Sequence, residues 1–381
     1  MFEYQKYNQY FAQTAGKMEE LCKQELVELG AKNVKSTYRG VYFVADFKLA
    51  MKITYLSTLA TRIYAPLLTF QCHSDRYLKN TAKKKINWKE LLSNDMTFAV
   101  NASVANSKIK HSKYASLCVK DSIADYFREN SGSRPNVDVK NPDVDFYLRV
   151  DKNKAVLSFN MSGGSLHRRG YRLESVSAPM QETLAAAVVR VSGWQGEKPL
   201  WDFMCGSGTI IAEALMRCCN IPAGYLRENF SFKHLPDFDD KEWQKIKNKE
   251  NAKIKPLKNG KLFATDISRD AVDAAKTNLS VLPGADKVVF NIEDFSNHVN
   301  SFENGYVIIN PPYGIRMGNK DTVMLLYQTI GDFLKQKCKN STAFIYVGDK
   351  KMAKHIGLKP SKRIPLVNGK LEGELLEIKI Y

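Results

Sequence analysis

The sequence has no apolar run long enough to cross a membrane. Although 44% of its 381 residues are hydrophobic, no stretch approaches the roughly 18 consecutive apolar residues of a transmembrane helix. The first residues, MFEYQKYNQYFAQTAGK, contain no basic segment followed by an apolar one, which argues against a secretory signal. We therefore expect a cytoplasmic protein with no membrane partner.

Cysteine is scarce, and its pattern argues against two kinds of small scaffold. The seven cysteines are scattered, odd in number and without CxxC spacing, so they indicate neither a disulfide framework nor a zinc site. We read them as reduced thiols and expect no metal. The apolar content is sufficient for real cores and excludes bulk disorder. A chain of this length has a prior of two or three domains.

Positive charge is what the chain has in excess. It carries 57 Lys and Arg against 40 Asp and Glu, a net charge of +17, and the first 165 residues hold 25 and 16 of these. The excess is therefore denser in the N-terminal part. Such a balance favours a polyanionic partner, with nucleic acid ahead of an acidic membrane surface. A basic surface that merely keeps the protein in solution is the alternative.

The order of predicted strands and helices changes near Gly163-Gly164, which divides the chain into two parts. Before this point short strands and helices mix, as in α+β domains. We predict helices at 16–31 and 46–63, and a hairpin that turns at Asp151–Lys154. A further helix at 112–132 is predicted to bury one face, made of Tyr114, Leu117, Ile123 and Phe127. After this point short apolar strands alternate with helices, which is typical of a doubly wound α/β sheet.

Polar residues directly follow four of the predicted strands in the second part. Ligands of such sheets bind beyond the carboxyl ends of the strands. The sequence therefore places four polar groups along one edge of the sheet: Asp202, Asp266, Asp294 and Asn310.

The first of these strands leads into a glycine-rich turn in DFMCGSGTIIAEAL. Gly206 and Gly208 let the backbone approach a ligand, and the helix that follows offers its N-terminus. The stretch is not a Walker loop, a serine-hydrolase elbow or a complete dinucleotide fingerprint. A purely structural turn is the alternative.

The next two strand ends carry carboxylates. Asp266 can accept hydrogen bonds from both hydroxyls of a ribose, and Asp294 from an adenine amino group, with Phe295 packing the adenine ring. The alternatives are that Asp266 caps the following helix and that Asp294 is a turn residue. Acidic residues and a glycine-rich turn at three successive strand ends make joint coincidence much less plausible.

The stretch NPPYG at 310–314 follows the apolar run 306–309. Two successive prolines suit neither a helix nor a sheet interior, so this is a plain loop or a rigid platform. As a platform it presents two acceptors, the Asn310 side-chain oxygen and the Pro311 carbonyl, held by Pro311-Pro312. These acceptors can orient an exocyclic base amine, while Tyr313 stacks on the base. The base must then be unpaired or flipped out.

Together these motifs resemble a class I S-adenosylmethionine-dependent methyltransferase of the amino-methylating type. The resemblance implies a Rossmann-like sheet, S-adenosylmethionine as the donor and no metal. It assigns donor binding to the first motif at Asp202, Cys205, Gly206, Ser207, Gly208 and Thr209, to the ribose-binding Asp266 with Ile267, to the adenine-binding Asp294 with Phe295, and to Asn310. It assigns catalysis to the (N/D)PP(Y/F) motif at Asn310, Pro311, Pro312 and Tyr313.

A longer resemblance narrows the family. SGGSLHRRGYR, followed by APMQETLAAAVVRVSGW, resembles the junction in bacterial 23S rRNA guanine-N2 methyltransferases, which place a THUMP domain before the catalytic domain. HSKYASLCVKDSIADYF resembles a THUMP helix, and a related subgroup carries a similar insert between Gly208 and Asp266. The resemblance implies a ferredoxin-like α+β domain at 1–60, an RNA-binding THUMP domain at 61–165 and the methyltransferase domain at 166–381.

The resemblance implies N2-methylation of guanine in 23S rRNA by a protein that we expect to be a monomer. Guanine-N2 methylation of tRNA, adenine-N6 methylation of RNA or DNA, and a non-enzymatic RNA-binding protein remain alternatives. RNA contacts are predicted for basic side chains at the domain junction and in the N-terminal part, the alternative being a structurally bonded linker and solvated faces. These side chains are His167, Arg168, Arg169, Arg172, Lys110 and Lys113.

Overall fold

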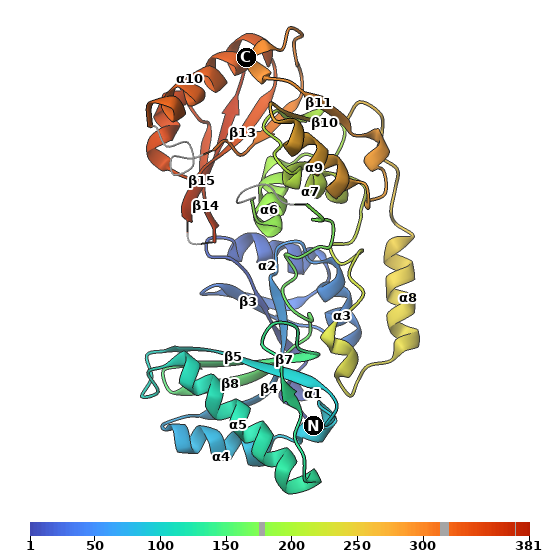
Figure 1. Ribbon diagram of the computed structural model, residues 1–381, viewed down its shortest axis with the longest axis vertical. Helices are drawn as coiled ribbons and strands as arrows, with labels where there is room; N and C mark the ends of the chain where they lie inside the picture. The colour runs from blue at the N-terminus through green and yellow to red at the C-terminus, as the bar shows by residue number, and fades with distance from the viewer. Residues whose placement is uncertain (175–179, 313–319, 370) are drawn as a thin grey trace. The chain divides into compact units, whose positions relative to one another are not determined.

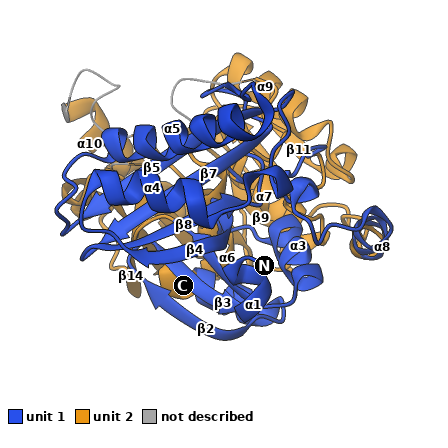
Figure 2. Ribbon diagram, turned by 90° about the horizontal axis from the view of Figure 1, so that it is seen from below, with its two compact units in different colours: residues 1–14, 22–166, 227–249 blue, residues 15–21, 167–226, 250–381 orange. Residues whose placement is uncertain are grey.

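The computed structural model describes residues 1–174, 180–312, 320–369 and 371–381. These residues form two compact units, shown in different colours in Figure 2. Unit 1 comprises residues 1–14, 22–166 and 227–249, and unit 2 comprises residues 15–21, 167–226 and 250–381. Across the described ranges, no helix is both long and apolar enough to span a membrane.

Unit 1 is built on one mixed sheet with the strand order β2-β3-β1-β4-β8-β7-β5-β6. Neighbouring strands are antiparallel except that β5 pairs in parallel with β6 and with β7. The β7–β8 hairpin turns with Asp151 opposite Lys154, which confirms the predicted hairpin. The strands are β1 (Gln9–Gln13), β2 (Lys32–Thr37), β3 (Gly40–Val44), β4 (Arg62–Gln71), β5 (Thr97–Ala105), β6 (Asn136–Val137), β7 (Val144–Asp151) and β8 (Lys154–Asn160).

Helices cover part of this sheet, and α4 and α5 pack side by side next to β5 (Figure 1). Along β7 the residues Phe146, Leu148 and Val150 are buried, while the alternate residues Tyr147 and Arg149 are only half-buried. Since side chains alternate between the faces of a strand, β7 has one deeply covered face and one more open face. The helices are α1 (Glu3–Tyr7), α2 (Glu19–Glu28), α3 (Phe47–Leu56), α4 (Asp75–Lys85) and α5 (Ser112–Ser131), with a 3₁₀ turn at Trp88–Glu90.

Two helix predictions in unit 1 need correction. The helix expected at 46–63 ends at Leu56, and Arg62 already begins β4. In α5, Ile123 and Phe127 are buried as predicted, but Tyr114 and Leu117 are exposed. Ala115, Cys118 and Val119 supply the buried face instead, because small residues let α5 lie close to its neighbours.

Unit 2 contains a seven-stranded sheet with the order β11-β10-β9-β12-β13-β15-β14. The first five strands in that order are parallel, and β15 and β14 are antiparallel to their neighbours. This confirms the predicted Rossmann-like sheet. The strands are β9 (Leu200–Asp202), β10 (Leu262–Asp266), β11 (Val289–Ile292), β12 (Tyr306–Ile309), β13 (Thr342–Val347), β14 (Lys362–Asn368) and β15 (Leu371–Lys379).

Buried residues on both faces explain why the central strands are continuously apolar. Val307 and Ile309 of β12 belong to a core cluster with residues of α10, such as Tyr327 and Ile330, whereas Ile308 is buried outside that cluster. The helices are α6 (Glu182–Ser192), α7 (Thr209–Cys218), α9 (Arg269–Leu279) and α10 (Lys320–Lys337), and 3₁₀ segments lie at Ala285–Lys287, Phe295–Asn297 and Lys350–Ile356.

The insert between Gly208 and Asp266 contains residues of both units. Its part 227–249 belongs to unit 1 and includes the 3₁₀ segment Ser231–His234 and most of α8 (Asp240–Asn251). The Arg227 guanidinium donates to the carbonyls of Ser162, Gly163 and Ser165 at 2.8–3.0 Å. The sequence interpretation assigned the whole insert to the C-terminal domain, whereas this part packs within unit 1.

Candidate active site

The strand order of unit 2 places three of the predicted polar residues at one edge. Strand β9 lies between β10 and β12. The chain adds β10 and β11 on one side of β9 and then β12 and β13 on the other side, so the end of β9 is a topological switch point. Asp202 is the last residue of β9, Asp266 is the last residue of β10, and Asn310 follows β12. In register, Val307 lies opposite Trp201, so β12 continues past the end of β9 toward Asn310.

The glycine-rich turn at 205–208 is fixed between β10 and α9. Gly206 donates its N–H to Asp266 Oδ2 at 2.9 Å, and Cys205 donates its N–H to the Thr265 carbonyl at 3.0 Å. Gly208 has a φ of +79°, and a Cβ there would lie 2.8 Å from Leu279 Cδ1. Both a left-handed backbone and close packing against α9 therefore demand glycine at position 208.

Asp202 is fully buried directly before this turn. Its Oδ1 accepts the Met204 N–H at 3.1 Å. Burial raises the pKa of the Asp202 carboxyl well above its ordinary value, the nearby Asp266 carboxylate raises that pKa further, and the Met204 N–H opposes the shift. Burial likewise raises the pKa of the Cys205 thiol, so Cys205 is a poor nucleophile. A cationic ligand beside Asp202 would compensate the buried carboxylate.

Asp266 holds the turn while part of its surface stays accessible. Its Oδ1 accepts the Ser268 N–H at 3.0 Å, in addition to the Gly206 contact of Oδ2. The N-cap of α9 is Ser268, whose hydroxyl accepts the Ala271 N–H, so the helix-capping alternative for Asp266 is wrong. Ile267 is 69% exposed and offers an apolar surface next to the carboxylate.

Asp294 and Phe295 are engaged more locally than the sequence suggested. Asp294 Oδ1 caps the segment Phe295–Asn297 by accepting the N–H and the hydroxyl of Ser296 at 2.9 and 2.8 Å. The alternative that Asp294 is a turn residue therefore holds for its Oδ1 atom. The Phe295 ring is 6% exposed and stacks on Phe203 with 4.7 Å between centroids, so it packs the core and leaves little surface for an adenine ring.

Asn310 carries an unsatisfied acceptor. Among the residues that the structure describes, the Oδ1 atom of Asn310 is buried and accepts no hydrogen bond. A buried amide oxygen without a donor is costly, at roughly 1–3 kcal/mol, and native proteins rarely keep one without a reason. Pro311 is buried, and Pro312 is half-buried. The predicted Tyr313 lies outside the described residues.

The junction segment 167–174 has an interior role that the charge pattern did not reveal. Arg169 is fully buried, with Nε 3.3 Å from Glu213 Oε1, and the same oxygen accepts the Tyr171 hydroxyl at 3.0 Å. Burial raises the pKa of Glu213, and Arg169 opposes that shift. Arg169 therefore stabilises the interior of unit 2 and is not placed to contact RNA phosphate, contrary to the prediction.

Arg172 links the junction segment to the first residue of α7. Its Nη2 donates to Thr209 Oγ1 at 3.1 Å and to the Met180 carbonyl at 2.9 Å. Its Nε lies 3.1 Å from Glu182 Oε1, an ion pair that is not aligned for a hydrogen bond. His167 is half-buried, and the side chains of Arg168, Lys110 and Lys113 are exposed, so these four remain predicted RNA contacts.

Sequence reasoning missed Asn278 on α9. Its buried amide accepts the N–H groups of Leu173 and Glu174 at 2.7 and 2.8 Å and donates to the Ser207 carbonyl at 3.0 Å. It thereby joins the junction segment to the glycine-rich turn. The only sequence signal was a polar residue between the apolar positions of a helix, which does not distinguish it from a solvent-facing asparagine.

Family models match three parts of the chain. An RMKL-like methyltransferase domain matches residues 169–377, a THUMP domain matches residues 78–160, and an RlmL ferredoxin-like domain matches residues 9–64. These matches follow one another in the order that the sequence predicted. They confirm a ferredoxin-like and THUMP region ahead of a methyltransferase domain.

Several solved structures resemble nearly the whole chain. The crystal structure of SMU.472 complexed with SAH has a TM-score of 0.87 and 25% identity, and the alignment covers 98% of both chains. TrmN from Thermus thermophilus has a TM-score of 0.72 at 16% identity, covering 98% of this chain and 99% of TrmN; this second likeness shows the fold alone.

Curated relatives agree with the family models. The protein slr0064 of Synechocystis sp. is 36% identical over 98% of this chain and 97% of its own length. The ribosomal RNA large subunit methyltransferase K/L of Vibrio parahaemolyticus is 34% identical over 96% of this chain. The chain spans about half the length of that relative, 52%. This chain belongs to the family of RMKL-like methyltransferases that carry an N-terminal THUMP domain.

Proposed function

We propose that this chain transfers a methyl group from S-adenosylmethionine to an exocyclic amine of an RNA base, and that the target is guanine N2 of 23S rRNA. One observation supports the chemistry above the others. The buried Asn310 Oδ1, without a donor among the described residues, lies past the end of β12 at the edge where donor-binding groups gather. An amino group of a base would supply the hydrogen bond that this oxygen lacks.

The residues at this edge fit a sulfonium nucleoside. When bound, S-adenosylmethionine supplies a methyl group that is already activated. The glycine-rich turn and the N-terminus of α7 admit the ligand close to backbone, and Asp266 offers carboxylate oxygens to ribose hydroxyls. The buried Asp202 carboxylate suits the positive charge of the donor. We keep Cys205–Thr209, Ile267 and Asp294 as further donor contacts and assign Phe295 to the core beneath them.

Asn310 and Pro311 orient the amine. The lone pair of an exocyclic amine is delocalised into the base, so the amine attacks well only when this lone pair is localised on the nitrogen and no longer conjugated with the ring. The Asn310 amide oxygen and the Pro311 carbonyl can accept the two hydrogens of the amine, and the prolines restrict the movement of these acceptors. The acceptors thus favour the geometry in which the nitrogen lone pair points at the methyl group.

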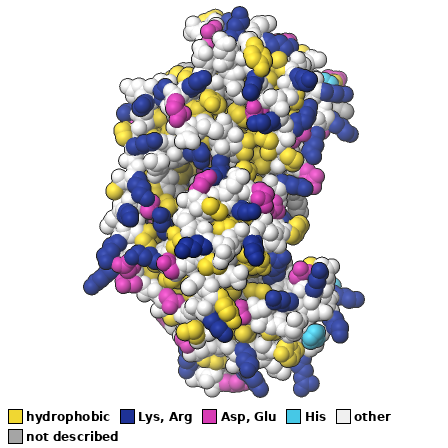
Figure 3. Space-filling model, turned by 180° about the vertical axis from the view of Figure 1, so that it is seen from behind, with side chains coloured by type: hydrophobic (Ala, Val, Ile, Leu, Met, Phe, Trp, Pro, Cys, Tyr) yellow, Lys and Arg dark blue, Asp and Glu magenta, His cyan; other side chains and the backbone are white. Residues whose placement is uncertain are grey.

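Several features support RNA as the substrate. The family places a THUMP domain ahead of the catalytic domain, and the K/L relative is named as a methyltransferase of large-subunit ribosomal RNA. Lys and Arg are spread widely over the face shown in Figure 3 and prevail over Asp and Glu, as phosphate binding requires. We propose domain limits at 1–60, 61–165 and 166–381, with the part 227–249 of the insert packed within unit 1, and a cytoplasmic, monomeric protein.

The base and the RNA are tested together by nucleoside mass spectrometry. Unmodified large-subunit rRNA, unmodified tRNA and a DNA duplex are each incubated with the protein and methyl-labelled donor, then digested. We expect label in N2-methylguanosine from rRNA. Label in N6-methyladenosine with none in N2-methylguanosine would show that the base is wrong, and label in tRNA alone would show that the RNA is wrong. Donor binding without any labelled product would favour a non-enzymatic protein.

A further inference from the structure

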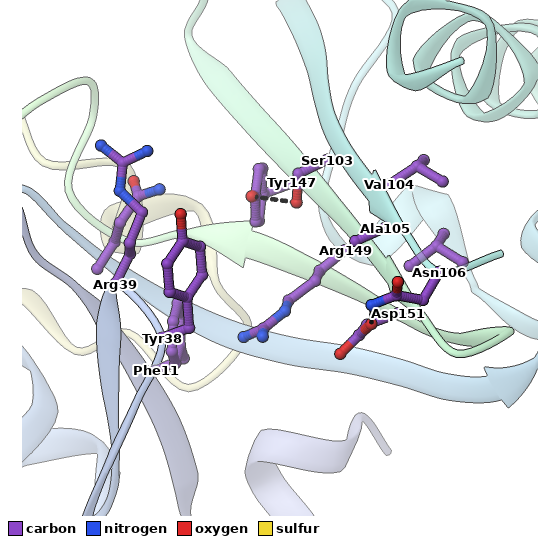
Figure 4. A pocket seen from close by; sticks show the side chains of 12 residues that line it. Phe11, Tyr38, Arg39, Ser103, Val104, Ala105, Asn106, Tyr147, Arg149 and Asp151 are labelled. Atoms are coloured by element: carbon purple, nitrogen blue, oxygen red, sulfur yellow. Dashed lines mark hydrogen bonds between the residues drawn. The ribbon is translucent and has the colours of Figure 1, made fainter. Parts of the chain in front are cut away.

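Unit 1 contains an aromatic cavity that the catalytic proposal does not use. Its volume is about 520 Å³, within the range of small-ligand sites. Residues from β1, the β2–β3 turn, the end of β5 and β7 line it, including Phe11, Tyr38, Tyr147 and Arg149 (Figure 4). It thus draws on both the ferredoxin-like and the THUMP matches, and neither range contains it alone.

The cavity opens beside a row of rings that crosses the sheet. Phe11 lies directly opposite Tyr42 of β3 and Tyr64 of β4 in register, so the three rings share one face. The centroid distances are 5.0 Å from Phe11 to Tyr42 and 4.8 Å from Tyr64 to Tyr147. The Tyr147 hydroxyl donates to Ser103 Oγ at 2.7 Å, which holds its ring in place.

Two arginines and one exposed ring are among the residues that line the cavity. The Arg149 guanidinium lies 5.7 Å from the centroid of the Phe11 ring. Arg39 follows Tyr38 in the β2–β3 turn, and Tyr38 is 78% exposed. In Figure 4, Tyr38 and Arg39 stand on one side and the Arg149 side chain extends toward them across the floor. A large ring exposed to this extent stabilises little of the fold and is available to a ligand.

The far end of the cavity has the opposite character. There Asp151 accepts a hydrogen bond from the Asn106 amide at 3.1 Å. A carboxylate at this end disfavours a phosphate, so an anionic backbone is held only on the side of Arg39 and Arg149. The cavity therefore combines flat apolar rings, two guanidinium groups on one side and polar groups on the other.

We infer that this cavity binds an unpaired segment of the RNA substrate, with a base stacked on Tyr38 and the neighbouring rings and its phosphate beside Arg39 and Arg149. Aromatic platforms flanked by cations are how proteins hold single-stranded nucleic acid, because every base has a flat face. A duplex hides its base faces, and a lipid surface or acidic peptide makes no use of a ring platform. The inference rests on the proposed function, which makes RNA the substrate.

The test measures binding of a fluorescein-labelled ten-nucleotide oligo(U) to the full chain as salt is varied. We expect Tyr38→Ala to weaken binding about tenfold or more, because it removes one stacking contact, without changing the salt slope. Arg149→Met should lower the slope of log K against log salt by about one, as a lost phosphate contact does. The controls Tyr77→Ala and Arg128→Met, on α4 and α5, should bind as wild type.

Three outcomes would overturn the inference. These are wild-type affinity in Tyr38→Ala, equal losses in Tyr77→Ala, or a blunt GC-rich RNA duplex that competes with oligo(U) as well as unlabelled oligo(U) does. Methyl transfer to rRNA separates this failure from that of the proposed function. A wild-type chain that binds oligo(U) through the cavity but methylates no RNA overturns only the proposed function. A chain that methylates rRNA, with variants that bind oligo(U) normally, overturns only the cavity.

Discussion

The two ligand-facing regions of the molecule are built in different ways. In unit 2, polar groups lie at the carboxyl edge of a parallel sheet, where β9, β10 and β12 end. In unit 1, the rings and guanidinium groups come from β1 and β7, on one face of a mostly antiparallel sheet, and from the β2–β3 turn. An edge offers directional hydrogen bonds from fixed backbone, whereas a face offers broad surfaces for stacking.

This difference suits two separate tasks. Orienting one amine toward one methyl group needs few acceptors held rigidly, as at Asn310 and the prolines after it. Holding an unpaired RNA segment needs area and charge but tolerates variation in sequence. Changes at the edge should therefore alter donor affinity or turnover, and changes on the face should alter RNA affinity. The next four predictions test the edge side of that division.

The largest effect is expected at Asn310. Asn310→Ala should lower single-turnover methyl transfer about 10²–10³-fold, as does removal of one oriented hydrogen-bonding group in other enzymes. Donor affinity by calorimetry should stay close to wild type, because Asn310 faces the amine. Asn310→Asp keeps an acceptor oxygen and should retain more turnover than Asn310→Ala. Wild-type turnover in the alanine variant would remove Asn310 from the mechanism.

At Asp266 we expect the reverse of the Asn310 result, because the substitution should weaken donor binding. Asp266→Ala removes hydrogen bonds to a charged acceptor, about 1.5–3 kcal/mol, and should weaken donor binding about ten- to a hundredfold. Oligo(U) affinity should not change. Asp270→Ala, an exposed carboxylate in the first turn of α9, is the matched control. Unchanged S-adenosylmethionine binding in a folded Asp266→Ala variant would sink the assignment.

Gly208 tests the rigidity of the edge. Gly208→Ala introduces a Cβ at a φ of +79° that meets Leu279 and Ala275 at 2.8 and 3.0 Å. We expect the free energy of unfolding to fall by roughly 2 kcal/mol more than in Gly193→Ala. Gly193 has a φ of +71° but no neighbour within 4 Å, so it isolates the backbone cost. If chemical denaturation shows equal losses of unfolding free energy in Gly208→Ala and Gly193→Ala, packing against α9 does not fix the turn.

The smallest effect concerns pH and Asp202. Because burial raises the pKa of the Asp202 carboxyl, the folded state binds a proton more tightly than the unfolded state does. This proton stabilises the folded state fully at pH values below the ordinary pKa of about 4. The stabilisation is lost as the pH rises through the pKa of Asp202 in the folded state. Without donor, the melting temperature of Asp202→Asn should therefore exceed that of wild type by a margin that grows with pH. A margin that shrinks as pH rises contradicts this account.

Asp202, Asp266 and Asn310 could be predicted because each is the last residue of its strand or directly follows it. Parallel strands end at a common edge, so Asp202, Asp266 and Asn310 fall together once the sheet is predicted. The interior contacts were not readable. Arg169 looked like surface charge and is a buried ion-pair partner.

The cavity of unit 1, in contrast, could not be predicted from the sequence. Tyr38, Phe11 and Tyr147 are separated by up to 136 positions in the sequence and lie near one another only through the register of β1, β3, β4, β8 and β7. No local pattern marks them, since rings in strands are usually core. Registers between distant strands depend on packing across the whole sheet, which single-sequence patterns do not determine.

Photo-crosslinking tests the separation of the two regions most directly. The full chain, saturated with S-adenosylhomocysteine, is irradiated with large-subunit rRNA containing 4-thiouridine, and the crosslinked peptides are identified by mass spectrometry. The account predicts crosslinks to peptides that contain Tyr38 and Tyr147 in unit 1, together with the peptide that contains Asn310 in unit 2. Crosslinks confined to unit 2, or unit 1 crosslinks found only on α4 and α5, would contradict it.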